Sequence, residues 1–181
     1  MKSKFIETDR LILKEITVED VDLILDFLTK NKDFFKPWEP LRSNDFYTKL
    51  TQINRIYSFL NEDNKFKFYI YLKEDLTKII GAIEVTNISR GILQNCTLGY
   101  KLDKDSTGNG YMIESLKTII QFVFEELKLH RIEADILPKN LPSIRLVEKL
   151  KFEREGLAKQ LLKINGRWED VYRFALINED F

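Results

Sequence analysis

Alternating polar and apolar residues mark the middle of the chain as strand. The segment "KFKFYIYLK", residues 65–73, alternates as a strand does when one face of its sheet meets solvent. The segments "KIIGAIEVTNI" and "NCTLGYKL" follow, joined by the short connections "EDLTK" and "SRG". Because connections of this length form hairpins, we expect the three strands to make an antiparallel meander.

Four further segments complete the predicted sheet. "RLILKEI" near the start of the chain predicts a first strand, and "RIEADIL" has the pattern of a buried strand. "FEREGLAKQLLKI" and "RWEDVYRFALI" lie on either side of Asn165-Gly166. An Asn-Gly pair between two strand patterns is the strongest short-range signal for a hairpin, so we expect the chain to end in one.

In other segments the apolar residues recur at intervals of three and four, which predicts helices. The first, in "ITVEDVDLILDFL", begins with Thr17 and Asp20 at the spacing of a capping box. A second helix covers roughly residues 44–60. The segment "FFKPWEP" between them is expected to be irregular, because Pro37 and Pro40 bracket it.

Two more helices follow the meander. The longer covers Tyr111–Leu127, with an apolar stripe at Ile113, Leu116, Ile120, Val123 and Leu127. The shorter lies in "NLPSIRLVEKL", with Pro142 in its first turn. The predicted order is β-α-α-β-β-β-α-β-α-β-β. We therefore expect one α+β domain over residues 1–181, with a mixed, mostly antiparallel sheet of about seven strands flanked by four helices.

Composition narrows the function classes. Lys plus Arg and Asp plus Glu number 29 each, which argues against a general binder of nucleic acid. One Cys and one His exclude an intrachain disulfide and make a Cys/His zinc site implausible, so no metal is expected. No apolar run approaches the length of a membrane span. We expect a soluble cytoplasmic protein without a membrane or nucleic-acid partner.

The segment "LDKDSTGNGYMIESL" places Gly108 and Gly110 immediately before the long helix. The first N–H groups of a helix have no intrahelical acceptor, and glycine lets an anion approach the backbone without meeting a Cβ atom. A phosphate site is therefore one interpretation, and a simple turn closed by two glycines is the other. The segment is not a Walker loop, because no Gly-Lys-Ser/Thr follows.

The same segment resembles the acyl-CoA diphosphate loop of the GCN5-related N-acetyltransferases (GNAT). The family pattern is Gln or Arg, two residues, Gly, one residue, and Gly or Ala. Here Thr107, Gly110 and Met112 occupy these three places, so two of them depart from the pattern. The segments "TDRLILK", "FFKPWEP", "LHRIEADILPKNLPSIRLVEKLKFEREG" and "INGRWEDVYRFAL" resemble the Rim-type branch, the ribosomal-protein alanine N-acetyltransferases. Lys151 stands where this branch usually has Gly.

The resemblance covers nearly the whole chain and implies a single GNAT-type domain that uses acetyl-CoA as cosubstrate. It places the diphosphate on the backbone amides of Thr107, Gly108, Asn109, Gly110 and Tyr111. The pantetheine arm would run along the strand Cys96–Leu102 like an added strand, beside Leu98, Tyr100 and Leu102. Asn140 would hold the arm from the other side.

The resemblance also implies direct transfer of acetyl to an amine. The Rim-type pattern of Asn, two residues and Ser is present at Asn140 and Ser143, and Ser143 is the predicted proton donor to the leaving thiolate. A second reading has Ser143 cap or line the first turn of its helix. Tyr100 is assigned to sheet packing, although a tyrosine near the thioester is also able to donate a proton.

The proton acceptor is less defined, because Leu162 stands where part of the branch has Glu. Glu84 is the first candidate and Asp170 the second, and the pattern of each taken singly favours an ordinary exposed strand carboxylate. The charged residues of "RIEADIL" are assigned to a solvated face. Trp38 is expected to wall the acceptor site, with core packing as the alternative.

Three functions remain open at this point. The first is acetylation of the N-terminal α-amine of a protein, such as a ribosomal protein. The second is acetylation of a small amine, such as a polyamine or an aminoglycoside. The third, from a different class, is a non-catalytic sensor that binds acyl-CoA. Either a monomer or a homodimer fits the sequence.

Overall fold

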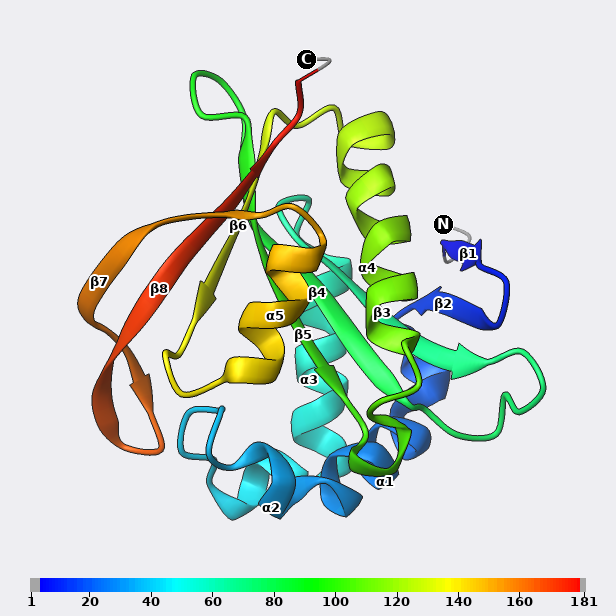
Figure 1. The fold of residues 1–181 in the computed structure, drawn as a ribbon. Helices are drawn as coiled ribbons and strands as arrows, with labels where there is room; N and C mark the ends of the chain where they lie inside the picture. The colour runs from blue at the N-terminus through cyan, green and yellow to red at the C-terminus, as the bar shows by residue number, and fades with distance from the viewer. Residues whose placement is uncertain (1–3, 180–181) are drawn as a thin grey trace.

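The computed structural model describes residues 4–179, and within them the strands form one eight-stranded sheet (Figure 1). The strand order across the sheet is β1-β2-β3-β4-β5-β6-β8-β7, and only β5 and β6 are parallel neighbours. The strands are β1 (Phe5–Glu7), β2 (Leu11–Glu15), β3 (Phe66–Leu72), β4 (Gly81–Ser89), β5 (Asn95–Leu102), β6 (Arg131–Ile136), β7 (Glu153–Ile164) and β8 (Arg167–Ile177). The ends of the predicted domain, residues 1–3 and 180–181, lie outside the described residues.

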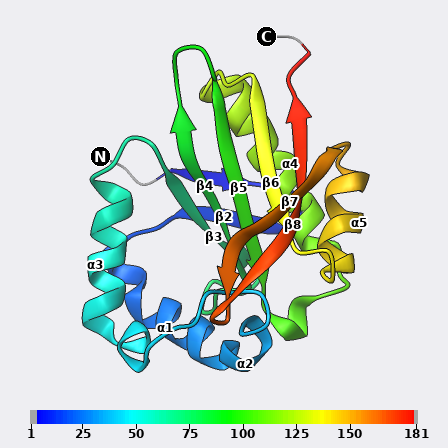
Figure 2. The same ribbon diagram turned by 90° about the vertical axis from the view of Figure 1, so that its left-hand side faces the viewer.

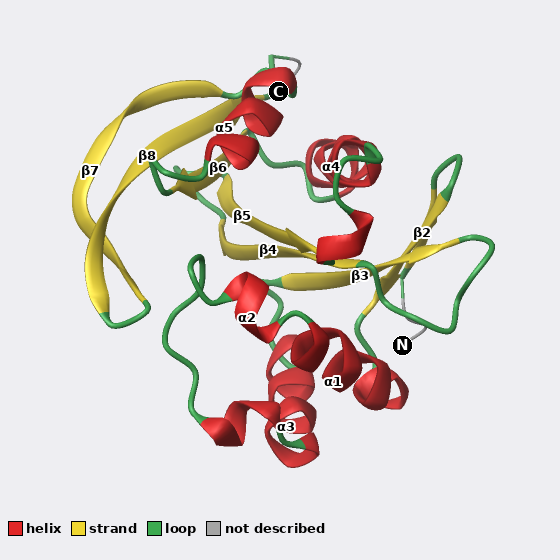
Figure 3. Cartoon of the chain, turned by 60° about the horizontal axis from the view of Figure 1, so that its bottom comes forward, coloured by secondary structure: helices red, strands yellow, loops and turns green. Residues whose placement is uncertain are grey.

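The helices cover both faces of the sheet (Figures 2 and 3). One face carries α1 (Val21–Lys30), α2 (Lys32–Phe35) and α3 (Lys49–Leu60), and the other carries α4 (Tyr111–Gln121) and α5 (Leu141–Lys149). Short 3-10 turns at Val18–Asp20, Asn44–Tyr47 and Lys104–Ser106 precede α1, α3 and α4, and the π-helical turn Phe122–Glu126 extends α4. None of the helices within residues 4–179 has the length and apolar character to cross a membrane.

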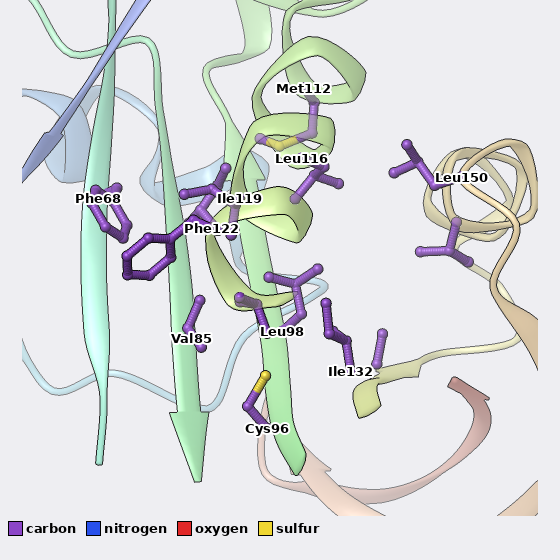
Figure 4. Packing of buried hydrophobic residues seen from close by; sticks show 14 of the residues in the cluster. Phe68, Val85, Cys96, Leu98, Met112, Leu116, Ile119, Phe122, Ile132 and Leu150 are labelled. Carbon is purple, nitrogen blue, oxygen red and sulfur yellow. The ribbon is translucent and has the colours of Figure 1, made fainter. Parts of the chain in front are cut away.

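Each face of the sheet has its own hydrophobic core. On the α4 face, the fully buried side chains of Leu116 and Ile119 pack against Phe68 of β3 and the rest of the cluster that Figure 4 shows. On the other face, Ile24 of α1 and Ile56 of α3 pack over β3. A third, smaller cluster joins the end of β6 to the β7–β8 hairpin through Leu137, Ile164 and Val171. Successive side chains of β3 point to opposite faces, so this one strand contributes to both large cores. The prediction that one face of this strand meets solvent was therefore wrong, because helices cover both sides.

The fold class and the element order are confirmed, and the counts need correction. The sheet has eight strands rather than about seven, because β1 adds three residues that are too few to show a periodic pattern. There are five α-helices within residues 4–179 rather than four, since the single turn α2 includes Phe34 and Phe35. The prediction that all of "FFKPWEP" is irregular was therefore wrong for its first two residues, and α2 ends before Pro37 as the proline rule requires.

Two predicted helix starts differ in detail. Thr17 and Asp20 do not form a capping box with the backbone, because the Thr17 hydroxyl donates to Asp20 Oδ2 at 2.6 Å instead. The helix predicted near residues 44–60 is interrupted at Thr48, whose extended backbone ends a 3-10 turn and whose side chain caps α3. The Asn165-Gly166 hairpin is as predicted, with positive φ at both residues (45° and 83°).

Candidate active site

The sheet opens between its two parallel strands. β5 and β6 pair only from Asn95–Thr97 to Arg131–Glu133, and beyond this point they separate (Figure 1). From Leu98 onward β5 has no partner on this side among residues 4–179. The opening lies beside α5, and its edge is the free backbone of β5.

The phase of the β4–β5 pairing shows which backbone groups face the opening. The Asp103 N–H donates to the Ile80 carbonyl oxygen at 2.7 Å, and in antiparallel pairs hydrogen-bonded positions alternate along the strand. It follows that Leu98, Tyr100 and Leu102 direct their N–H and C=O groups away from β4. These are the residues predicted to line the pantetheine arm, and their backbone is free to pair with an extended ligand.

The glycine loop before α4 is open to an anion. Gly108 and Gly110 have φ values of 82° and 78°, and a Cβ added at Gly108 would meet no atom within 4 Å. Within residues 4–179 no acceptor receives the amide N–H groups of Gly108, Asn109, Gly110 and Tyr111. The Thr107 amide differs, because it donates to the Lys104 carbonyl at 3.3 Å. The loop is thus a turn that also presents free donors at a helix N-terminus.

Two hydroxyl groups meet on the α4 and α5 side of the opening. The Tyr100 hydroxyl and Ser143 Oγ lie 2.5 Å apart, which joins β5 to the first turn of α5. Burial raises the pKa of Tyr100 to about 12, and the hydrogen bond to Ser143 opposes this rise. Asn140 is the N-cap of α5 and accepts the Ser143 N–H at 3.3 Å, so Ser143 lines the first turn without capping it. The pair is a protonated donor at neutral pH.

Two charged residues, Lys67 and Glu84, lie side by side on the face of the sheet that carries α1–α3. Lys67 of β3 is paired across the strands with Glu84 of β4, and Glu84 is paired with Gly99 of β5. Lys67 Nζ lies 2.8 Å from Glu84 Oε1. Burial alone raises the pKa of Glu84, but neighbouring cations, Lys67 first among them, outweigh burial and bring this pKa to about 2. Glu84 is therefore ionised and accepts a proton weakly.

Asp135 is a second carboxylate near Gly99, and sequence analysis did not select it. It lies two residues beyond Glu133 on β6, so continued pairing with β5 would place it opposite Gly99 across the opening. Its Oδ1 is buried without a hydrogen bond among residues 4–179, and Arg173 Nε lies 3.5 Å away. Burial raises the pKa of Asp135, and Arg173 opposes this rise only in part. Asp135 is the stronger base of the two carboxylates.

The signal for Asp135 was present in the sequence but ambiguous. Arg131, Glu133 and Asp135 share one face of β6, since Ile132 and Ala134 point into the α4 core. A row of charges on one strand face is the ordinary pattern of a solvated sheet. Only the early end of the β5–β6 pairing distinguishes Asp135 from its neighbours, and this is a property of tertiary structure.

The loop after α2 closes the Glu84 face. Trp38 packs with Leu137, Ile164 and Val171 in the cluster beneath the β7–β8 hairpin. Glu39 accepts a hydrogen bond from Lys101 Nζ at 2.5 Å, and its carbonyl accepts the Asn165 N–H at 3.0 Å. These contacts fix the loop between β5 and the hairpin turn.

A pocket of about 410 Å³ opens beside this loop. Its lining comes from α2, the loop that follows it, the residue before the α5 cap and the β7–β8 hairpin: Asp33, Lys36, Pro37, Lys139, Ile164, Asn165, Arg167 and Glu169. The predicted candidates Trp38 and Asp170 are not part of this lining. Asp170 Oδ1 accepts the Gln160 amide of β7 at 2.8 Å, and Leu162 packs against the Trp38 cluster.

Known proteins share this arrangement over nearly the full chain. A family model described as "Acetyltransferase (GNAT) domain" matches residues 10–153. The probable N-acetyltransferase YjcK of Bacillus subtilis is 38% identical over 173 residues, which is 94% of this chain and 95% of that protein.

Two solved structures are also similar. The ribosomal-protein-S5-alanine acetyltransferase of Vibrio fischeri superposes with a TM-score of 0.90 at 31% identity, covering 98% of each chain. Mycobacterium smegmatis RimJ, solved in complex with CoA-disulfide, superposes with a TM-score of 0.87 at 24% identity, covering 94% of this chain and 83% of its own.

Proposed function

The chain belongs to the GNAT acetyltransferase family, and from this premise we propose that it acetylates the N-terminal α-amine of a protein, a ribosomal protein being the leading candidate. The enzyme is an acetyltransferase related to the ribosomal-protein alanine acetyltransferases. Its cosubstrate is acetyl-CoA, in line with the coenzyme A found in a structural neighbour. We place the reaction in the cytoplasm, where ribosomal proteins are made.

One observation carries the proposal. The free edge of β5, the open amides of the Gly108–Gly110 loop and the Tyr100–Ser143 hydroxyl pair border the same opening. An extended thioester that pairs with the β5 edge would have its diphosphate end at the α4 N-terminus and its sulfur near the two hydroxyl groups. The opposite face carries Glu84 and Asp135 and leaves Gly99 without a side chain. The acceptor amine would enter from there.

The charges of the 410 Å³ pocket favour a peptide over a polyamine. Its lining contains three cations, Lys36, Lys139 and Arg167, and two anions. Lys139 pairs with Glu169 at 2.9 Å, which leaves Asp33 as the anion without an ion pair among the described residues. A polycation would meet net positive charge here. A peptide with mixed or acidic side chains after its first residue fits the lining better.

In the proposed reaction, one face of the sheet supplies the proton acceptor and the other supplies the proton donor. The amine must lose a proton to attack the thioester carbon, and we assign its proton to Asp135, with Glu84 as the weaker alternative. A free backbone N–H on β5 would stabilise the oxyanion. When the C–S bond breaks, the thiolate takes a proton from Ser143, and Tyr100 passes its own proton to Ser143. The nitrogen loses its second proton as the amide forms, and this proton, carried through solvent, restores Tyr100. The products are the acetylated amine and free coenzyme A.

The test is acetyl transfer from acetyl-CoA to peptides that begin with Ala, Ser or Thr, followed by thiol release and by mass spectrometry. Spermidine and an aminoglycoside are the competing acceptors, and the same peptides with a blocked N-terminus are the control. We expect a mass gain of one acetyl group on the free α-amine only. Faster turnover of spermidine than of the peptides would show that the acceptor is a small amine. Binding of coenzyme A without turnover of any amine would favour a sensor.

A further inference from the structure

The segment "TDRLILK" lies about 100 residues before the diphosphate loop, and it contacts that loop directly. We propose that Arg10 is a positioning residue for the diphosphate: it orients the Gly110 N–H toward the anion and neutralises Glu114 beside it. The proposal rests on the proposed function, since it concerns the acetyl-CoA site of that reaction. It assigns a role to a segment that the catalytic geometry leaves unexplained.

Glu114 is the anchor of Arg10. This carboxylate is in the first turn of α4, and the β1–β2 turn gives it three hydrogen bonds and one further ion-pair contact. The hydrogen bonds come from the Arg10 backbone N–H at 3.0 Å, from Arg10 Nε at 2.8 Å and from the Thr8 hydroxyl at 2.5 Å, and Arg10 Nη2 lies 2.7 Å from Oε2, the oxygen that Nε also contacts. The planar guanidinium contacts this oxygen through two nitrogens, which a lysine does not reproduce.

The remaining donor of Arg10 acts on the loop itself. Arg10 Nη1 donates to the Asn109 carbonyl oxygen at 3.1 Å, and its guanidinium lies 4.7 Å from the centre of the Tyr111 ring. In a trans peptide the C=O and the following N–H point in opposite directions. Holding the Asn109 carbonyl toward Arg10 therefore turns the Gly110 N–H to the other side of the loop. This N–H has no acceptor among residues 4–179.

Charge gives Arg10 a second role. An unpaired carboxylate in the first turn of α4 would repel a diphosphate bound at the same helix end, whereas the helix dipole attracts one. Burial alone raises the pKa of Glu114, but the hydrogen bonds from Thr8 and Arg10 outweigh it and hold this pKa below its ordinary value. Glu114 is thus ionised, and Arg10 supplies the compensating charge within hydrogen-bond distance.

The other reading is that Arg10 only ties the first strands to α4. Lys4 offers a matched control for this reading, because it also joins the first strand region to the α4 segment. Its Nζ lies 2.6 Å from Glu126 and 4.2 Å from the centre of the Phe122 ring, in the π-helical turn at the opposite end of the segment. Lys4→Ala removes a comparable ion pair and leaves the diphosphate loop untouched.

The experiment compares Arg10→Ala, Arg10→Lys and Lys4→Ala with the parent enzyme. Steady-state kinetics are measured with acetyl-CoA and with S-acetylpantetheine, which lacks the diphosphate and the nucleotide. We expect Arg10→Ala to raise KM for acetyl-CoA roughly tenfold or more, with kcat within about twofold. Lys4→Ala should leave KM within about twofold, and Arg10→Lys should lie between them. With S-acetylpantetheine, Arg10→Ala and the parent should have equal kcat/KM.

The double variant Arg10→Ala/Glu114→Gln separates the two roles of Arg10. Removing the charge of Glu114 should restore part of the acetyl-CoA affinity, on the order of threefold. The rest of the loss should remain, because the loop still lacks the hydrogen bond from Arg10. Calorimetric binding of coenzyme A gives the same comparison without turnover. An unchanged Kd or KM in Arg10→Ala, or an equal loss with S-acetylpantetheine, would overturn the proposal. A parent enzyme that neither binds coenzyme A nor turns over would instead reject the proposed function.

Discussion

Replacement of Asp135 by Asn tests both the proton acceptor and the class of acceptor. The substitution removes the carboxylate with the raised pKa and keeps its size. Arg173 retains Glu133 as a partner at 3.2 Å, so no buried cation is left alone. In the variant, only amine that has already lost its proton in solution is able to react. The loss of rate should therefore follow the fraction of neutral amine.

That fraction differs widely between the two kinds of acceptor. An α-amine with a pKa of about 7.7–8.0 is roughly 10–17% neutral at pH 7, so Asp135→Asn should lower kcat/KM roughly tenfold. A lysine-like amine with a pKa of about 10.4 is only about 0.04% neutral, and the loss would exceed a thousandfold. At pH 9 the α-amine is over about 90% neutral, and its deficit should shrink to less than twofold.

The assay is kcat/KM from pH 6 to pH 9 for an N-terminal peptide and for spermidine. Asp26→Asn, which removes an exposed carboxylate of α1, is the control and should reproduce the parent profile. Parallel profiles for Asp135→Asn and the parent would refute the role of Asp135. A deficit that persists at pH 9 with the peptide would refute the reasoning from neutral amine, even if the rate at pH 7 falls.

The same variant has a linked effect on stability. Burial raises the pKa of Asp135 in the folded state, so its ionised form destabilises folding once the pH exceeds the unfolded value of about 3.9. At neutral pH, Asp135→Asn should therefore raise the melting temperature. This gain should vanish below the unfolded pKa of about 3.9, where the aspartate is protonated in both states. A variant that is more stable and less active would mark Asp135 as a residue kept for function.

Four further predictions concern single residues. Ser143→Ala should lower kcat about tenfold to a hundredfold with KM for acetyl-CoA unchanged, because Asn140 still caps α5; equal rates in steady-state assays would remove Ser143 from the chemistry. Gly110→Val should weaken coenzyme A binding in calorimetry and lower stability by about 1–2 kcal/mol, since φ is 78°. Lys151→Gly should raise the free energy of unfolding in urea by about 1 kcal/mol, because this residue follows the C-cap of α5 with a φ of 69°. Glu84→Gln should lower the free energy of unfolding by several kcal/mol, because it leaves the buried Lys67 without an ion-pair partner. A small change would show that the Lys67 ammonium group is hydrated in the variant.

The fold was predictable because its strands and helices carry clear periods. The strand pattern of β3 and the Asn165-Gly166 turn are local signals, and the structure has the strand and the turn, although β3 is buried on both faces rather than on one. The short elements were not predictable, since β1 and α2 owe their form to neighbours rather than to a pattern of their own. Lys151 is an instructive case. The resemblance marked it as a departure from glycine, and the structure gives it a positive φ. Its N–H donates to the Glu148 carbonyl and the Phe152 N–H donates to the Val147 carbonyl, and these two bonds form a Schellman motif.

The sequence indicates residues for the cofactor side of the proposed site more directly than for the acceptor side. Apart from Asn140, the residues proposed for the cofactor belong to two neighbouring stretches, the β5 edge and the loop before α4, so one segment of sequence indicates them together. The carboxylates belong to separate strands, and their proton affinities depend on partners such as Lys67 and Arg173 that lie elsewhere in the sequence. Glu84 was the first candidate from sequence, but Lys67 lies beside it in the sheet, and the charge of Lys67 makes Glu84 a weak base.

The geometry of β5 would allow one strand to contact both substrates of the proposed reaction. Leu98 and Tyr100 point to the α4 and α5 side, where Tyr100 meets Ser143, while Gly99 and Lys101 face the α1–α3 side. The backbone edge between these two faces is free because β6 leaves after Thr97. A thioester paired with that edge would lie in the plane of the sheet, with its leaving sulfur near one face and its carbonyl carbon open to the other at Gly99. A Cβ at Gly99 would meet no atom within 4 Å, so this position leaves open space beside Glu84. A side chain there would stand between the amine and the thioester carbonyl carbon. In the proposed reaction, the parting of β5 and β6 would thus keep the cofactor and the acceptor on different faces of the sheet.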